Sequence, residues 1–156
     1  MSLNPSAVVP PGYQNFHSPS STHFDDRLKS FIQENALENI IGAYMTDIVP
    51  DVVDPNSSNV APAEADTDRF LELLATLGHG AYDVICFSGQ AFEALREVVE
   101  ADEIDLEHNI TAFTGVANEV EITAYRVWHY SNYGANVAKI PELERQLRYL
   151  NDEILE

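Results

Sequence analysis

Three polar residues, Asn4, Asp47 and His129, each follow a short apolar stretch and carry side chains suited to hydrolysis. An amide and a carboxylate can orient or activate a water molecule, and a carboxylate can also read a hydrogen-bond donor on a substrate. An imidazole placed at a developing oxyanion contributes a few kcal/mol of transition-state stabilisation. These residue types therefore predict a site that splits a bond with water and stabilises the leaving group.

The same region of the sequence also allows ordinary structural interpretations. His129 can be a histidine at a strand end that solvent satisfies, and Thr46-Asp47 is common turn chemistry after a strand. Cys86 lies inside an apolar run, which favours a core position over a role as nucleophile. Ser88-Gly89 after a strand resembles half of a phosphate cradle, but a single glycine is a weak signal.

The remaining histidines show no spacing typical of metal ligands, and the sequence has no cluster of Cys and His. These histidines are His17, His23, His79 and His108. We therefore expect neither a metal site nor a cofactor.

The elements that would position these residues follow from hydrophobic periodicity. Short apolar runs rich in β-branched and aromatic residues predict strands over residues 39–45, 82–87 and 121–129, and residues 1–3 resemble the stub of a fourth. Helical spacing predicts helices over residues 24–36, 66–77, 91–99 and 141–154. We expect the acidic residues 101–118 to form a loop with a short strand or turn.

Helices that alternate with short apolar strands are typical of a parallel sheet covered on both faces. Parallel strands end at a shared edge, and open α/β sheets bind their ligands in the crevice outside the carboxyl ends of the strands. Asn4, Asp47, Ser88 and His129 would each lie at that edge. The sequence thus predicts a single α/β domain over residues 1–156 with a binding crevice there.

The charge balance of the chain bears on its partners. The 156 residues include 26 Asp and Glu against eight Lys and Arg, a formal net charge of −18. Such a chain repels nucleic acid on average, unless the few cations gather on one face. The cations that could gather beside His129 are Arg126, Lys139, Arg145 and Arg148.

Other features of the sequence concern the compartment. Cys86 is the single cysteine, so no internal disulfide can form. No apolar run approaches the ~20 residues that span a bilayer. The start Met-Ser-Leu-Asn-Pro has neither the basic nor the apolar region of a signal peptide. We therefore expect a cytoplasmic protein that does not bind membranes.

Four short motifs occur in order over nearly the whole chain: Leu3-Asn4-Pro5-Ser6, Phe16-His17-Ser18-Pro19 with His23-Phe24, Thr46-Asp47-Ile48-Val49, and His129-Tyr130-Ser131. Together they resemble the motifs of the uracil-DNA glycosylase superfamily, and most closely those of its mismatch-specific uracil/thymine-DNA glycosylase branch. Three positions differ from the family pattern. Ser6 stands where the family has a second Gly, Asp47 where it has Asn or Lys, and Tyr130 where it has Pro.

The resemblance implies a three-layer αβα fold with a short central parallel sheet. It also implies that the protein hydrolyses the N-glycosidic bond of uracil, or of a mispaired or damaged base, in DNA, after the base is flipped from the stack. Asn4 would position the attacking water, His129 would stabilise the departing pyrimidine anion, and Phe16 would stack on the flipped base. The other substrate-binding residues that the resemblance implies are Thr46, Asp47 and Ser131.

Two other functions are compatible with the same fold. One is a non-enzymatic module that binds a nucleotide or a protein partner. The other is a hydrolase of a free nucleoside or nucleotide, which would tolerate an acidic surface better. Cations gathered beside His129 would favour DNA, whereas scattered cations with a closed pocket would favour a small molecule.

The first strand of the resembled fold raises a further expectation. A typical strand has ~5–6 residues, yet only Met1, Ser2 and Leu3 precede Asn4. An empty central position would expose unpaired N–H and C=O groups on the neighbouring strands. We therefore expect a sheet that lacks most of its first strand, and a natural polypeptide that extends upstream of Met1 or another segment that fills the position.

Overall fold

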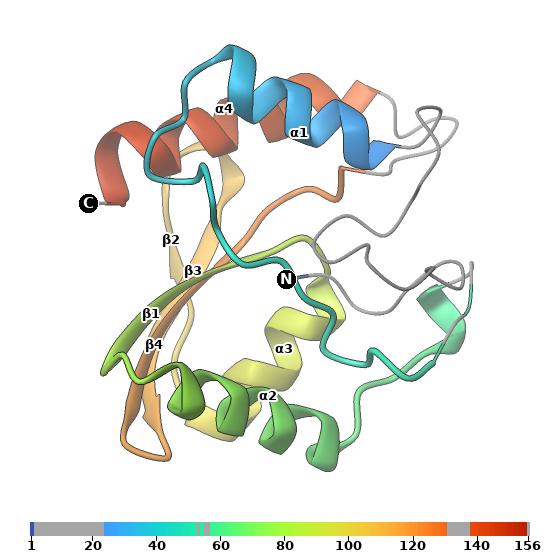
Figure 1. The fold of residues 1–156 in the computed structure, drawn as a ribbon, viewed down its shortest axis with the longest axis vertical. Coiled ribbons are helices and arrows are strands. Elements are labelled where there is room, and N and C mark those ends of the chain that lie inside the picture. The colour runs from blue at the N-terminus through green and yellow to red at the C-terminus, as the bar shows by residue number, and fades with distance from the viewer. Residues whose placement is uncertain (2–23, 53, 55–56, 131–137, 156) are drawn as a thin grey trace.

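The computed structural model describes residues 1, 24–52, 54, 57–130 and 138–155, which form a mixed α/β fold (Figure 1). Its elements in chain order are α1 (Phe24–Glu34), η1 (Ser57–Asn59), α2 (Glu64–Leu77), β1 (Ala81–Cys86), α3 (Gly89–Val99), β2 (Ile104–Asp105), η2 (Glu107–Asn109), β3 (Thr111–Ala117), β4 (Val120–Arg126), α4 (Ile140–Tyr149) and η4 (Leu150–Ile154). Among these described elements, no helix combines the length and the apolar character needed to cross a membrane.

The four strands form one sheet in the order β1-β4-β3-β2. β1 and β4 are parallel, with pairs from Ala81↔Glu121 to Cys86↔Arg126. β3 is antiparallel to both of its neighbours, β4 and β2. The prediction of an all-parallel sheet is therefore wrong, because a hairpin supplies the strands on one side of β4.

The acidic residues 101–118, predicted to be mostly loop, contain β2, η2 and the long strand β3. A tight turn at Asn118 and Glu119 joins β3 to β4, and both residues have left-handed φ angles, 51° and 64°. Two consecutive residues of positive φ are the geometry of a two-residue hairpin turn whose twist matches that of the strands. Glu119 stands where such turns usually carry Gly, so the sequence signal for the hairpin is weak.

The strand predicted over residues 39–45 is absent from the described structure, which has turns and coil there. The N–H groups of Ile40 and Ile41 both donate to the Leu37 carbonyl at 2.9 Å, and Ala43 donates to Ile40. Gly42 follows with a φ of 83°. These local hydrogen bonds turn the chain back on itself, so the apolar run does not extend. Tyr44 is left 60% exposed.

The predicted helices are present, with shifted ends. α2 begins at Glu64 rather than Asp66, because the Asp66 carboxylate accepts a hydrogen bond from the Ala63 N–H at 3.0 Å and caps the helix. It ends at Gly78, whose φ of 80° is the left-handed conformation expected of a glycine after a helix. Pro141 lies in the first turn of α4, as predicted.

Helices lie on both sides of the sheet: α2 and α3 on one, α1 and α4 on the other (Figure 1). Each side has its own apolar core. The larger buried side chains of the first are Phe70, Leu71, Leu74, Val84, Phe92, Leu95, Phe113 and Ile122. Those of the second include Leu28, Leu37, Phe87, Ile110, Tyr125, Leu143, Leu147 and Leu150. Cys86 is fully buried in the first core, as its apolar surroundings in the sequence predicted.

Gly115 lies in β3 at the point where the end of α3 comes closest. A Cβ atom at this position would lie 2.7 Å from Cβ of Val99 and 2.8 Å from its Cγ2. Because valine branches at Cβ, it cannot rotate these atoms away. We expect Gly115→Ala to lower the free energy of unfolding by about 1–3 kcal/mol, measured by urea denaturation.

Gly80→Ala is the matched control, since an added Cβ there has no neighbour within 4 Å. Equal losses of stability in the two variants would contradict this packing argument.

Candidate active site at the carboxyl ends of β1 and β4

The carboxyl ends of β1 and β4 lie side by side because the two strands are parallel and in register. The pairing continues past both strands, where the Val127 N–H donates to the Cys86 carbonyl at 3.0 Å. On the other edge of β1, the Met1 amino group donates to the Ile85 carbonyl, and the Phe87 N–H donates to the Met1 carbonyl at 2.9 Å. Met1 is therefore level with Cys86, at the end of β1.

Asp47 and His129 both lie near the Met1 amino group. Its positive charge contributes to lowering the pKa of His129. The Asp47 carboxylate in turn acts to raise the pKa of the amino group, although burial outweighs it and leaves that pKa lowered. The structure thus brings two residues far apart in the sequence to the same end of β1.

His129 is partly buried and neutral at pH 7. Burial lowers its pKa to about 4, and the charge of the Met1 amino group acts in the same direction. The ring stacks on that of Tyr130 with centroids 4.7 Å apart, and Tyr130 meets the edge of Phe87 at 5.1 Å. A neutral imidazole has one N–H donor and one acceptor nitrogen. This environment differs from that of a strand-end histidine satisfied by solvent.

Asp47 is buried, with 5% of its surface exposed, and occupies an isolated β-bridge position. The hydroxyl of Thr46, directly before it, donates to the Asp47 carbonyl at 3.3 Å. A buried carboxylate is costly unless it is paired or hydrogen-bonded, and the Met1 amino group supplies an opposite charge. Asp47 is therefore unlike the exposed turn residue that Thr-Asp after a strand commonly represents.

The other predicted site residues, Asn4, Phe16 and Ser131, lie outside the described residues. Within the described ranges, no group of three or more His, Cys, Asp and Glu side chains is arranged to hold a metal ion.

Gln146 is a residue of this region that the sequence analysis missed. It lies on the apolar side of α4 and is 1% exposed. Its Oε1 accepts the Trp128 N–H at 2.9 Å, and its Nε2 donates to the carbonyls of His108 at 3.0 Å and Asn109 at 3.4 Å. Gln146 thus ties the segment directly before His129 to η2. A polar residue between Leu143 and Leu147 on an otherwise apolar helix face was the available signal.

Two residues beside the strand end have structural roles. Ser88, read as half of a phosphate cradle, caps α3 by accepting the Ala91 N–H on its Oγ at 3.4 Å. Burial raises the pKa of Cys86 to about 11, which keeps it a thiol at neutral pH. Since the thiolate is the reactive form, Cys86 is not an activated nucleophile.

The two cations nearest to His129 in the sequence have partners within the protein. Arg126 donates to Glu93 at 3.1 Å and to the Thr111 hydroxyl at 3.0 Å. The Lys139 ammonium lies 4.3 Å from the centre of the Trp128 ring. Because Trp128 directly precedes His129, Lys139 is the cation that this contact holds beside the candidate site.

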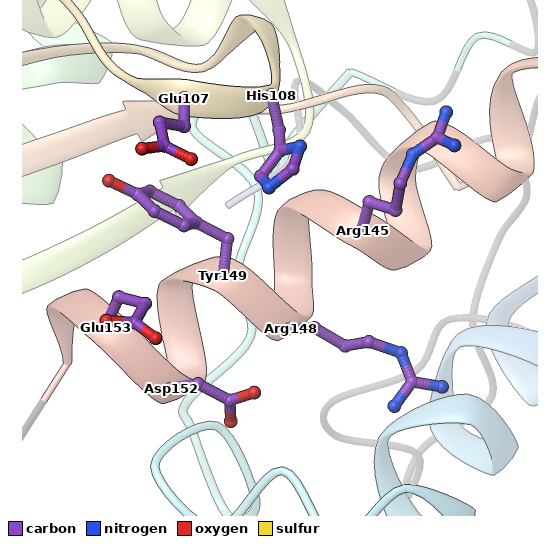
Figure 2. Close-up of a pocket in the computed structure, with 7 residues that line it drawn as sticks. All are labelled: Glu107, His108, Arg145, Arg148, Tyr149, Asp152 and Glu153. Atoms are coloured by element: carbon purple, nitrogen blue, oxygen red, sulfur yellow. The ribbon is translucent and has the colours of Figure 1, made fainter.

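The other two cations line a separate depression of about 670 Å³ beside α4 (Figure 2). Arg145 pairs with Glu142, and Arg148 reaches toward α1 and donates to the side chain of Asn35, the residue directly after that helix. His129 does not line this depression. The four cations are thus divided between two places instead of forming one basic patch beside His129.

Comparison of the chain with models of protein families, with curated proteins and with solved structures finds no match.

We expect Gln146→Met to lower the free energy of unfolding by about 1–3 kcal/mol, the cost of leaving buried backbone groups unsatisfied. The Trp128 N–H and the His108 carbonyl lose their partner in this variant. Urea denaturation measures the loss, and Gln33→Met on the exposed surface of α1 is the matched control. A loss no larger than that of the control would contradict the proposed role of Gln146.

The pKa of about 4 for His129 predicts a pH-dependent stability. The ordinary value in an unfolded chain is about 6.5, so the unfolded state binds more protons between these two pH values. The stability contributed by neutral His129 is complete above about pH 6.5 and is lost as the pH falls to about 4. We expect the wild-type chain to lose more stability across this range than His129→Asn.

Urea unfolding at a series of pH values tests this, with His79→Asn on the exposed surface as control. Wild-type and His129→Asn chains with the same pH dependence would show that His129 titrates normally.

Proposed function

We propose that this chain is a DNA N-glycosylase of the uracil-DNA glycosylase type, which hydrolyses the bond between deoxyribose and uracil or a mispaired or damaged base. The observation that carries the proposal is that Asp47 and His129 both lie near the Met1 amino group, which is hydrogen-bonded at the end of β1. Both residues belong to motifs that resemble those of the superfamily. Met1 lies directly before another of these motifs, Leu3-Asn4-Pro5-Ser6, with only Ser2 between them.

A three-layer αβα arrangement is part of the same proposal. Helices on both sides of the sheet support it (Figure 1), as do two separate apolar cores and the parallel pairing of β1 with β4. In this fold the carboxyl ends of the parallel strands form the crevice that receives the flipped base.

The neutral state of His129 suits the proposed reaction. When the glycosidic bond breaks, the pyrimidine leaves with the bonding electrons, and negative charge develops on its carbonyl oxygens. A neutral imidazole can donate its N–H to such an oxygen. In a partly buried site, a donor fixed beforehand stabilises this charge more strongly than it would in water. The His129 ring stacks on Tyr130, and the backbone directly before it is held by the hydrogen bond from the Trp128 N–H to Gln146. Both contacts support a fixed orientation of the imidazole.

The remaining roles follow from the motifs. Asn4 positions the attacking water and Phe16 stacks on the flipped base. Thr46 and Asp47 contact the base, where an ionised carboxylate can only accept hydrogen bonds, such as one from a ring N–H. Ser131 belongs to the loop that contacts the DNA.

The charge distribution favours a second candidate, a hydrolase of a free nucleoside or nucleotide. Ion pairs with Asp or Glu engage five of the arginines: Arg27, Arg69, Arg96, Arg126 and Arg145. Fewer cations therefore remain to neutralise DNA phosphates, which supply most of the affinity of ordinary DNA-binding proteins. A single nucleotide needs far less compensating charge.

An oligonucleotide assay tests the proposal. The chain is incubated at low salt with labelled DNA carrying uracil, mispaired thymine or hypoxanthine, and abasic sites are cleaved by alkali. We expect abasic product from uracil DNA. Asn4→Ala should remove most of the activity, and His129→Ala should lower the rate by about 10²–10³-fold, the effect of losing one oxyanion donor.

The control variant is His79→Ala, an exposed histidine that precedes β1 and should leave the rate unchanged. Release of base from free deoxyuridine or its monophosphate, without abasic product in DNA, would establish the second candidate instead. Absence of both reactions would leave the non-enzymatic binding module. Equal rates for wild-type, Asn4→Ala and His129→Ala chains would place the active site elsewhere.

A further inference from the structure

Trp128 is the only tryptophan of the chain, and it lies between the end of β4 and His129. It is 37% exposed, although tryptophan is on average a highly buried residue type. Its N–H donates to the Oε1 of the buried Gln146 at 2.9 Å, which holds the backbone at this point. Trp128 therefore presents an accessible ring from a fixed backbone position.

A cation lies against this ring. The Lys139 ammonium is 4.3 Å from the centre of the Trp128 ring. Within the described residues, Lys139 forms no ion pair with a carboxylate, in contrast to Arg126 and Arg145, which both pair with glutamates. The acidic residue in the first turn of the following helix, Glu142, is the one that pairs with Arg145. Lys139 thus keeps its positive charge beside Trp128, in a chain with a formal net charge of −18.

An accessible aromatic ring next to a cation is the combination that binds single-stranded nucleic acid, because a base stacks on the ring and the cation contacts the phosphate. Stacking of one base on an aromatic side chain changes a binding constant by about 5- to 150-fold. A cation over an exposed aromatic ring contributes about 2- to 5-fold. A base therefore displaces the ammonium from the ring, and the released ammonium is free to contact the adjoining phosphate.

The place of Trp128 in the chain suits a base next to the one that reacts. Cα atoms of consecutive residues, such as Trp128 and His129, are about 3.8 Å apart. Successive bases along one DNA strand are separated by about 3.4 Å. The ring thus lies about one nucleotide step from the imidazole proposed to stabilise the leaving base.

We propose that Trp128 is a stacking platform for a nucleobase beside the target nucleotide, and that Lys139 contacts the phosphate next to that base. This inference rests on the proposed action on DNA. It gives a role to a residue that directly precedes the His129-Tyr130-Ser131 motif without belonging to it. Because every base has a π-face, the platform supplies affinity without sequence preference.

Stacking also suits the charge of this chain. Most of the affinity of ordinary DNA-binding proteins comes from the neutralisation of phosphates by Lys and Arg. This chain has eight such residues against 26 Asp and Glu. A stacked base adds affinity that requires no cation, so one platform and one lysine replace part of a wider basic surface.

The fluorescence of the single tryptophan tests the proposal directly. The chain is titrated at low salt with an oligodeoxyadenylate of about eight nucleotides, which carries none of the proposed target bases. We expect binding to quench the fluorescence of Trp128 in a saturable manner. An abasic deoxyribose-phosphate oligomer of the same length should bind at least about fivefold more weakly and quench far less.

Three results of this titration would overturn the proposal. They are absence of binding, binding of the oligodeoxyadenylate without a change in fluorescence, and equal quenching by the abasic oligomer. The DNA is undamaged, so the result does not depend on catalysis. Quenching without abasic product in the glycosylase assay would retain the platform and reject the enzyme, and abasic product without quenching would do the reverse.

Variants separate the roles of the two residues, with anisotropy of a labelled oligodeoxyadenylate as the measure of binding. Trp128→Ala should weaken binding by about 5- to 150-fold, and Trp128→Phe, which retains a ring, should weaken it less. Lys139→Gln should lower the slope of log affinity against log salt concentration by about 0.7. Lys29→Gln on the exposed surface of α1 removes the same charge and should leave the slope unchanged. Equal slopes for the two lysine variants would overturn the phosphate contact of Lys139.

Discussion

The parallel pairing of β1 with β4 is the interaction on which the rest of the structure depends. Six residue pairs hold the two strands in register, and the Val127 N–H extends the pairing past their ends. Both apolar cores pack against the faces of this pair. A shift of one residue would exchange the two faces of a strand and move its core residues to the wrong side. The same register decides where His129 lies, since that residue follows β4 by only three positions.

The candidate site combines groups whose charges depend on one another. Burial and the nearby Met1 amino group both lower the pKa of His129. Burial also lowers the pKa of the Met1 amino group, and the Asp47 carboxylate acts to raise it. Gln146 contributes no charge but holds the backbone before His129 through a buried side chain. The position of His129 therefore depends on the pairing of β1 with β4 and on the side-chain amide of Gln146.

The sequence by itself determined the elements that depend on local periodicity. The apolar runs of β1 and β4, the helical spacing in α2, α3 and α4, and the core position of Cys86 could all be predicted, because a period of two or of 3.6 residues is written in neighbouring residues. The place of His129 shortly after a strand could be predicted in the same way, since it follows β4 by three residues. Asp47 was placed by a strand over residues 39–45 that the described structure does not contain, so its burial near Met1 did not follow from the rule that parallel strands share a carboxyl edge.

Only the tertiary structure decided the features that depend on distant partners. β3 is a strand because β4 pairs with it across the Asn118–Glu119 turn. Residues 39–45 do not form a strand, because their backbone groups make local hydrogen bonds in turns. The burial of Gln146 depends on carbonyls of η2, and the neutral state of His129 depends on burial and on the amino group of Met1. Strand pairing and the burial of polar side chains depend on residues far away in the chain, so they cannot be predicted from the neighbouring residues alone.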